Sequence, residues 1–280
     1  MALTQFNPIT EENEIRSFLS EEARDIKISV VEVTGSTNED MKKRARGGEE
    51  EISLLVAQSQ TAGKGSKGRS FFSPDGTGIY MSLLVRPDCP AEESTLLTPM
   101  AAVATAEAIE KVTGTEAKIK WVNDIFADGR KVSGILTEGA AEKSGRRLEW
   151  AVIGIGINIK RPEGGFPAEI ENIAGAVYSG EEKIKNRLIA ETVNNFVRYY
   201  KSLTGREFYS AYRDRLFILS KEITVTVADE SFTATVTDID PMFRLKVRLS
   251  DGSERLLSSG EVSVMFNAQF AMPNAQSRDS

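Results

Sequence analysis

The stretch "QTAGKGSKGRSFFSPDGTG", residues 60–78, decides which phosphate-binding folds remain open to this chain. Residues 63–68 fit the pattern G-x-G-x-x-G, and residues 63–70 fit the P-loop pattern except that Arg69 stands where its lysine belongs. Both patterns require a helix directly afterwards, since the helix N-terminus supplies the amides and the dipole that bind phosphate. Here an aromatic, proline-containing and glycine-rich run follows and leads towards a strand. The sequence therefore argues against both a Rossmann dinucleotide fold and a P-loop phosphotransferase.

The same loop combines a mobile backbone with positive charge. Three glycines and three cations lie within residues 63–69 of a chain whose net charge is −6. Glycines let backbone N–H groups approach an anion, which Lys64, Lys67 and Arg69 would neutralise. Charge-assisted hydrogen bonds contribute about 1.5–3 kcal/mol each, enough for three to hold a phosphate-bearing ligand. A solvated basic loop is the alternative, but the density of glycines and cations favours an anion site.

Composition excludes several classes of function. The 280 residues, 40% of them hydrophobic, are enough for one large and one small domain. The acidic net charge argues against nucleic-acid and anionic-membrane partners. A single cysteine permits no internal disulfide, and the absence of histidine excludes Ser-His-Asp, Cys-His and zincin chemistry. The first residues do not resemble a signal peptide, and no apolar run is long enough to span a membrane, so we expect a cytoplasmic protein.

The pattern of elements changes near residue 218. Before it, apolar strands alternate with helices, the longest of which is expected over residues 94–114 and ends near a glycine. After it, short strands separated by turn residues predict a small β-barrel. We therefore expect a domain over residues 1–217, a barrel over 218–266 and a disordered tail over 267–280.

Residues 117–139 predict a hairpin with Asp128-Gly129 as its two-residue turn. In that register residue 126 faces 131, and residue 124 faces 133. Alternation then places four side chains on one face: Asp124, Phe126, Lys131 and Ser133. Asp124 and Lys131 become diagonal neighbours, about 7–8 Å apart at Cα. Lys120 joins that face if the strand extends back to it.

Five segments occur in the order and rough spacing of the biotin protein ligases, a family that this chain resembles over residues 25–265. The segments are "STN" at 36–38, "QTAGKGSKGRSFFSP" at 60–74, "KWVNDI" at 120–125, "KVSGIL" at 131–136 and "IGIGINI" at 153–159. "YRDRLF" at 212–217, followed by "SDGSERLLSSGEVS" at 250–263, is similar to the C-terminal part of such enzymes.

The resemblance implies both a fold and a reaction. The fold would be α+β, a mixed β-sheet flanked by helices as in class-II-synthetase-like ligases, with a small SH3-like β-barrel after it. The reaction would use ATP and Mg²⁺ to convert biotin to biotinyl-5'-AMP and then biotinylate one lysine of a biotin carboxyl carrier protein domain. About 27 residues precede the first catalytic strand, which implies a monofunctional ligase without a DNA-binding domain. Dimerisation is common in the family, but no feature of this sequence fixes it.

The resemblance also assigns residues by their place in the motifs. The implied biotin site comprises Ser36, Thr37, Asn38, Gln60, Lys64, Gly65, Ser66 and Lys131. The implied ATP site comprises Lys64, Lys67, Arg69, Lys120, Trp121, Asn123 and Asn158. The implied catalytic residues are Lys131, Asp124 and Arg69. Mg²⁺ would be held mainly through the ATP phosphates, so no protein metal site is expected.

Several of these residues also have a purely structural interpretation. Ser36 lies three residues before a glutamate, the spacing of a capping box. Trp121 fits a nucleotide-pocket wall and a core position equally well. Without the resemblance to the family, Lys131 would be interpreted as a solvent-facing lysine on a hairpin. Gly154 and Gly156 permit close approach of a ligand or another backbone, although strand packing also explains them.

The sequence departs from the family pattern at one position, and two alternatives to biotin ligation remain open. Ser66 occupies a position where the family usually has arginine, which predicts either that Lys67 substitutes for it or that the adenylate is held less tightly. A lipoyl or octanoyl transferase of related fold is one rival, weakened by the absence of the histidine typical of those enzymes. A non-catalytic nucleotide- or carrier-binding module is the other, and the presence of Lys131 and Asp124 argues against it.

Overall fold

The computed structural model describes residues 10–177, 184–227 and 230–264. The expected tail over 267–280 lies outside these residues. Contacts divide the chain into two compact units, Met1–Phe217 with Pro241–Phe243, and Ile218–Asp240 with Arg244–Ser280. Among the described helices, none combines the length and the apolarity that crossing a membrane requires.

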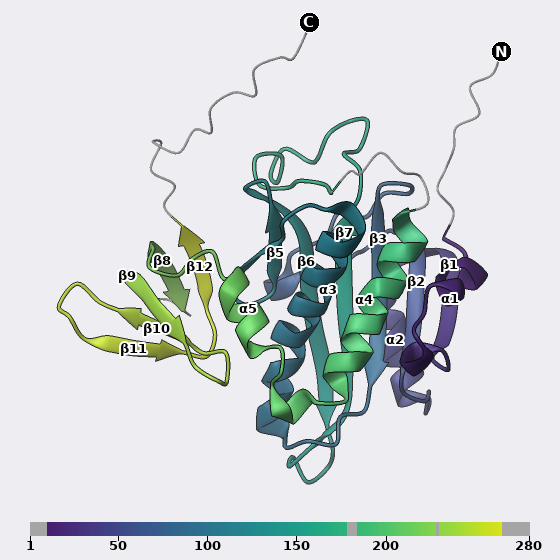
Figure 1. Ribbon diagram of the computed structural model, residues 1–280, viewed down its shortest axis with the longest axis horizontal. Coiled ribbons are helices and arrows are strands. Elements are labelled where there is room, and N and C mark those ends of the chain that lie inside the picture. The colour runs from purple at the N-terminus through teal and green to yellow at the C-terminus, as the bar shows by residue number, and fades with distance from the viewer. Residues whose placement is uncertain (1–9, 178–183, 228–229, 265–280) are drawn as a thin grey trace, which may run out of the picture. The chain divides into compact units, whose positions relative to one another are not determined.

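A seven-stranded mixed sheet forms the centre of the first unit (Figure 1). Its strands, in spatial order, are β1 (Lys27–Thr34), β2 (Ser53–Gln60), β3 (Gly78–Val85), β7 (Leu148–Asn158), β6 (Arg130–Ala141), β5 (Asp124–Ala127) and β4 (Lys118–Lys120). β1 and β2 are parallel, and the other neighbours are antiparallel. The parallel pair is joined by a crossover helix, as its topology requires.

Helices cover both faces of this sheet. The helices are α1 (Glu12–Ser17), α2 (Thr37–Arg46), α3 (Leu97–Thr113), α4 (Ile184–Tyr200) and α5 (Tyr209–Arg215). On β6, Thr137 is bonded to Thr98 of α3, whereas its neighbour Glu138 is bonded to Lys42 of α2. Because successive strand residues point to opposite faces, α2 and α3 lie on opposite sides of the sheet. α3 and α4 lie side by side across their face (Figure 1). The predicted α+β architecture is confirmed.

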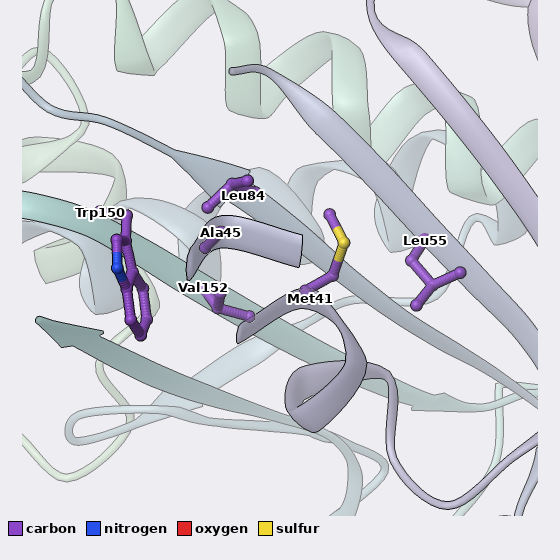
Figure 2. Packing of buried hydrophobic residues seen from close by; sticks show 6 residues of the cluster. All are labelled: Met41, Ala45, Leu55, Leu84, Trp150 and Val152. Carbon is purple, nitrogen blue, oxygen red and sulfur yellow. The ribbon is translucent and has the colours of Figure 1, made fainter. Parts of the chain in front are cut away.

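The α2 face carries a compact hydrophobic cluster, shown in Figure 2. Its members are Met41, Ala45, Leu55, Leu84, Trp150 and Val152, all at most 4% exposed. Met41 and Ala45 are four residues apart on α2, so they lie on the same side of the helix. The cluster therefore fixes α2 on the sheet, and with it the helix N-terminus that begins at Ser36.

The end of the apolar helix α3 was well predicted, although the helix begins at Leu97 rather than at residue 94. α3 ends at Thr113, and Gly114 follows in a left-handed conformation with φ of 71° that glycine adopts readily. Most of its residues are buried, because the helix packs against the sheet, against α4 beside it and against α5. This burial explains why apolar residues are spread around much of the helix rather than confined to one stripe.

The hairpin prediction was right about the turn and wrong about the register beyond it. β5 and β6 join through Asp128-Gly129, and residue 126 pairs with 131 as expected. The register then shifts, so residue 125 pairs with 133 and Asp124 faces Gly134 rather than Ser133. This bulge leaves Val132 as the extra residue and turns Ser133 to the opposite face, where it is buried.

The second unit is a five-stranded antiparallel sheet. Its spatial order is β11 (Glu254–Leu257), β10 (Leu245–Arg248), β9 (Glu230–Ile239), β8 (Glu222–Val227) and β12 (Glu261–Val264). The predicted short strands are present, with apolar residues alternating inward along β9 and β10. Within the described residues no ladder joins β11 to β12, so a closed barrel is not seen.

Candidate functional site

Three polar residues at the start of α2 are buried. Ser36, Thr37 and Asn38 are each 3–4% exposed. Ser36 occupies the N-cap position, but its side chain makes no capping hydrogen bond. The predicted capping box is therefore wrong. The Ser36 side chain caps no backbone N–H, and the Glu39 carboxylate pairs with Lys42 and Lys64 instead.

Gln60 at the end of β2 reaches this segment. Its Oε1 accepts hydrogen bonds from Thr37 N at 2.9 Å and from Thr37 Oγ1 at 3.1 Å. Its Nε2 donates to Ser73 Oγ at 2.9 Å. The parallel pairing of β1 with β2 explains the meeting, because both strands end at the same edge of the sheet.

Asn38 lies flat against the central strands. Its Oδ1 accepts from Ser82 Oγ at 2.6 Å, and its Nδ2 donates to Leu136 O at 3.3 Å and to Glu138 Oε2 at 2.9 Å. A Cβ built on Gly154 would lie 2.2 Å from Asn38 Oδ1. Glycine is thus required at position 154 because the Asn38 side chain approaches the strand there. The sequence predicted a close approach by a ligand or another backbone, and the structure shows a side chain instead.

The glycine loop folds back on itself. Gly65 N donates to Arg69 O at 2.7 Å and Phe71 N to Gly63 O at 2.9 Å, while Lys64 bridges to Ser70. A Cβ on Gly63 would lie 2.5 Å from Phe71 O, so this reversal needs glycine. A single 3₁₀ turn, Ser66–Gly68, is its only helical part, and the chain from 70 to 77 contains no helix. The exclusion of P-loop and Rossmann geometry is confirmed.

Ionic contacts join this loop to the sheet. Lys64 pairs with Glu39, Lys42 bonds to Glu39 at 2.8 Å, and Lys42 bonds to Glu138 at 2.6 Å. Hydrogen bonds from Lys42 and Lys64 lower the pKa of Glu39 to about 2, so its carboxylate is ionised at neutral pH. Two positive and two negative charges therefore alternate from the loop through α2 to β6.

Lys131 and Asp124 form an ion pair on the hairpin, with Nζ and Oδ1 2.5 Å apart. The bulge brings Gly134 opposite Asp124, and a Cβ there would lie 3.3 Å from Lys131 Cε. Lys131 is also held by its backbone, which donates to Ile173 O and accepts from Gly175 N, each at 2.8 Å.

The ion pair and the buried polar segment share one face of the sheet. Gly134 on β6 pairs with Gly156 on β7, two residues from the Gly154 that Asn38 covers. The ring of Phe71, which ends the glycine loop, covers Gly156, where a Cβ would meet it at 2.5 Å. Since residues two apart on a strand point to the same face, the loop, Asn38 and Lys131 lie on one side.

The remaining predicted residues are placed as follows. Lys120 pairs with Asp124 across β4 and β5, so it shares that face. Asn123 donates to Ile135 O at 2.8 Å. Asn158 donates at 3.0 Å to the carbonyl of Gly175, whose N–H donates to Lys131 O. Trp121 is 5% exposed and donates its indole N–H to Phe243 O at 2.7 Å, which favours the core interpretation.

Sequence reasoning missed Ser82 and Glu138. Ser82 is fully buried, and its hydroxyl lies 2.8 Å from Thr37 Oγ1 as well as bonding Asn38. Its only signal is a lone serine within the apolar strand "GIYMSLLV". Glu138 lies two residues beyond "KVSGIL", where a glutamate on a strand is unremarkable without knowledge of its partners.

Comparisons with known proteins agree with this arrangement. Residues 30–158 match the model of the biotin/lipoate A/B protein ligase family, and residues 218–265 match the biotin protein ligase C-terminal domain. The chain belongs to the biotin protein ligase family. The two matches fall on the two structural units, and the antiparallel sheet of the second unit corresponds to the biotin protein ligase C-terminal domain.

Individual relatives extend the biotin protein ligase match. The chain is 37% identical over 199 residues to the bifunctional ligase/repressor BirA of Bacillus subtilis, covering 70% of this chain and 61% of the relative. It is 28% identical over 247 residues to the biotin--[acetyl-CoA-carboxylase] ligase of Mycobacterium tuberculosis, covering 84% and 88%. A biotin protein ligase from Aquifex aeolicus in complex with biotin and ATP has the same fold, with a TM-score of 0.70, 24% identity and coverage of 85% and 97%.

Proposed function

We propose that this chain uses ATP to convert biotin to biotinyl-5'-AMP and transfers the biotinyl group to a lysine of a biotin carboxyl carrier protein domain. The observation that carries the proposal is the shared face, where the buried Ser36–Asn38 segment, the glycine loop and the Lys131–Asp124 ion pair lie together. The chain spans about 61% of the length of BirA from Bacillus subtilis, so the activity in that relative's name is a proposal for this chain.

The polar segment suits the biotin head group, a cyclic urea with N–H donors and a carbonyl acceptor. Ser36, Thr37, Asn38 and Gln60 supply hydroxyls and amides at short range in a buried setting, where such bonds are strongest. Lys64, Gly65 and Ser66 would follow the ligand's tail towards the phosphate. Lys131 would meet its carboxylate.

The adenylation step needs two anions to approach each other. A carboxylate oxygen of biotin attacks the α-phosphorus of ATP, one P–O bond breaks, and pyrophosphate leaves with the electron pair. Lys131 would neutralise the two anions as they meet and stabilise the charge that develops. Arg69 would act on the pyrophosphate side of the same junction.

The ATP site is proposed on the same face. Lys64, Lys67 and Arg69 from the loop and Lys120, Asn123 and Asn158 from the strand ends would surround the nucleotide. Mg²⁺ fits here as a partner of the ATP phosphates, because the Asp124 carboxylate is a hard oxygen donor and one or two such groups are enough. When bound, the metal neutralises the phosphates and orients them.

The carrier domain, the location and the assembly complete the proposal. We place the reaction in the cytoplasm, with residues 1–217 as the ligase domain and 218–266 as the C-terminal domain. The net charge of −6 supports a protein partner rather than nucleic acid. A homodimer would use a sheet edge, of which β1 is one.

The decisive experiment is ATP–pyrophosphate exchange by the purified protein with biotin, with lipoate and without an added acid. We expect exchange with biotin alone. Exchange with lipoate alone would establish the lipoyl-type alternative, which is the relevant rival because the matching family model covers both classes. Exchange with neither acid would leave a binding module and defeat the proposed reaction.

We expect that Ser66 lets biotinyl-5'-AMP dissociate from the protein before the biotinyl group is transferred. In the structure Ser66 contacts Arg69, whose Nη2 lies 3.3 Å from Ser66 Oγ, so the loop has a neutral hydroxyl at this point. Ser66→Arg adds a charge-assisted contact and should slow release of labelled adenylate by about tenfold. Ser66→Gln, of similar length but neutral, is the control. If release is the same in all three proteins, Lys67 already supplies the missing charge and the leak hypothesis is wrong.

A further inference from the structure

A series of polar contacts crosses the sheet beneath α2 and ends on a carboxylate that has no assigned role. Ser82 on β3 bonds to Asn38 on α2, Asn38 bonds to Glu138 on β6, and Glu138 bonds to Lys42, one turn further along α2. The three distances are 2.6, 2.9 and 2.6 Å. Asn38 is 4% exposed, so its amide must satisfy its hydrogen bonds within the protein or with a ligand.

The hydrogen-bonding capacity of Asn38 is almost used up. Its amide has two N–H donors and an oxygen with two lone pairs. Leu136 O and Glu138 Oε2 take both donors, and Ser82 Oγ takes one lone pair. A flipped amide would point its oxygen at a carbonyl and a carboxylate, neither of which can donate. Glu138, which accepts the shorter of the two bonds, therefore acts with Leu136 O to set which end of the amide faces the sheet, and one lone pair of Oδ1 is left available.

We propose that Glu138 is a positioning residue of the biotin site, holding Asn38 so that this point of the site only accepts a hydrogen bond. The ligand must then present a donor there, which a cyclic urea N–H does. This inference rests on the proposed biotin-binding function. It assigns Glu138 no contact with the ligand, because its carboxylate is already engaged by Asn38 and Lys42.

Lys42 keeps the arrangement electrically balanced. Its side chain is 13% exposed and contacts both Glu138 and Glu39. Burial alone would lower the pKa of Lys42, but the hydrogen bonds that Lys42 donates to the two carboxylates, together with their negative charges, outweigh it and raise the pKa. The charged lysine thus offsets a carboxylate placed close to the buried face.

Glu138→Gln tests the proposal because it keeps the shape and removes the charge. Its amide can face Asn38 with either end, so only the longer bond to Leu136 O still favours one orientation of the Asn38 amide. We expect the dissociation constant for biotin, measured by calorimetry, to rise by about tenfold or more. The KM for biotin in pyrophosphate exchange should rise equally, while kcat and the KM for ATP change less than about threefold. Glu149→Gln, an exposed glutamate on β7, is the matched control.

A swap of the two side chains separates positioning from simple loss of stability. Asn38→Asp alone places two carboxylates against each other and should weaken biotin binding. In the double variant Asn38→Asp/Glu138→Gln the bond between the two positions reforms with its polarity reversed, and an oxygen still faces Ser82. The bond to Leu136 O is lost in Asn38→Asp and in the double variant alike. We expect the double variant to bind biotin about tenfold more tightly than Asn38→Asp alone.

The outcomes are distinguishable. Failure of the wild-type protein to bind biotin would overturn the proposed function itself. Equal biotin affinity in wild type and Glu138→Gln would overturn only the positioning role. If Glu138→Gln does not fold, Glu138→Asp replaces it, because the shorter side chain keeps the charge but falls short of Asn38. Unchanged biotin affinity in that variant would likewise defeat the inference, and about tenfold weaker binding would support it.

Discussion

Replacing Lys131 by methionine should lower the kcat of biotin-dependent ATP–pyrophosphate exchange by about 10²–10³-fold, the usual effect of removing one preorganised charge from a reaction centre. Methionine keeps most of the side-chain stem and removes the ammonium. Lys131 Nζ lies 2.5 Å from Asp124 Oδ1, and the Lys131 backbone is hydrogen-bonded to Ile173 and Gly175, so the ammonium is held in one position.

The control for this variant is at the other end of the same sheet. Lys27 on β1 pairs with Glu49, also at 2.5 Å, but its side chain is 62% exposed. Lys27→Met should leave exchange unchanged, because an exposed ion pair contributes only about 0–1 kcal/mol even to stability. Biotin binding by calorimetry should weaken at most about tenfold in Lys131→Met, as loss of one charged contact allows. Near-normal kcat in Lys131→Met would show that the ammonium has no role in catalysis.

Gly154→Ala should damage both the fold and the site. The added Cβ would lie 2.2 Å from Asn38 Oδ1 and 2.8 Å from its Cγ, distances that real structures do not contain. Asn38 cannot retreat because three hydrogen bonds hold it, and β7 cannot shift because it is paired on both edges. We expect a loss of about 1–3 kcal/mol in the free energy of unfolding, as for other overpacked cores.

Urea denaturation and biotin calorimetry would measure the two effects of this substitution. Gly164→Ala is the matched control, since a Cβ there meets nothing within 4 Å. The double variant Asn38→Ala/Gly154→Ala removes the clash and should regain stability while biotin binding stays weak. If Gly154→Ala has the same urea midpoint as the wild-type protein and binds biotin with the same affinity, Asn38 does not approach Gly154 closely in solution.

Local signals in the sequence were sufficient for much of the fold. The end of α3 at a left-handed glycine and the two-residue turn of the hairpin follow from backbone preferences that neighbouring residues determine. The mixed sheet and the identity of the site segments came from the resemblance. Placing Lys131 beside Asp124 required only the pairing nearest the turn, so the bulge did not disturb it.

The errors have a common physical origin in contacts between distant segments. The bulge at Val132 breaks the alternation that the register prediction assumed, and no local residue announces it. The capping box failed because Lys64, 25 residues away, takes the glutamate that the cap would use. Glu138 was missed because its role depends on Asn38, which lies 100 residues earlier in the chain.

The alternating charges Lys64, Glu39, Lys42 and Glu138 join a surface loop to a central strand through one helix. Each inner charge has two partners of the opposite sign, so neutralising either one leaves like charges as neighbours. Anyone redesigning the glycine loop for a different acyl group would therefore be redesigning α2 and β6 as well, and the four positions are best exchanged as a set.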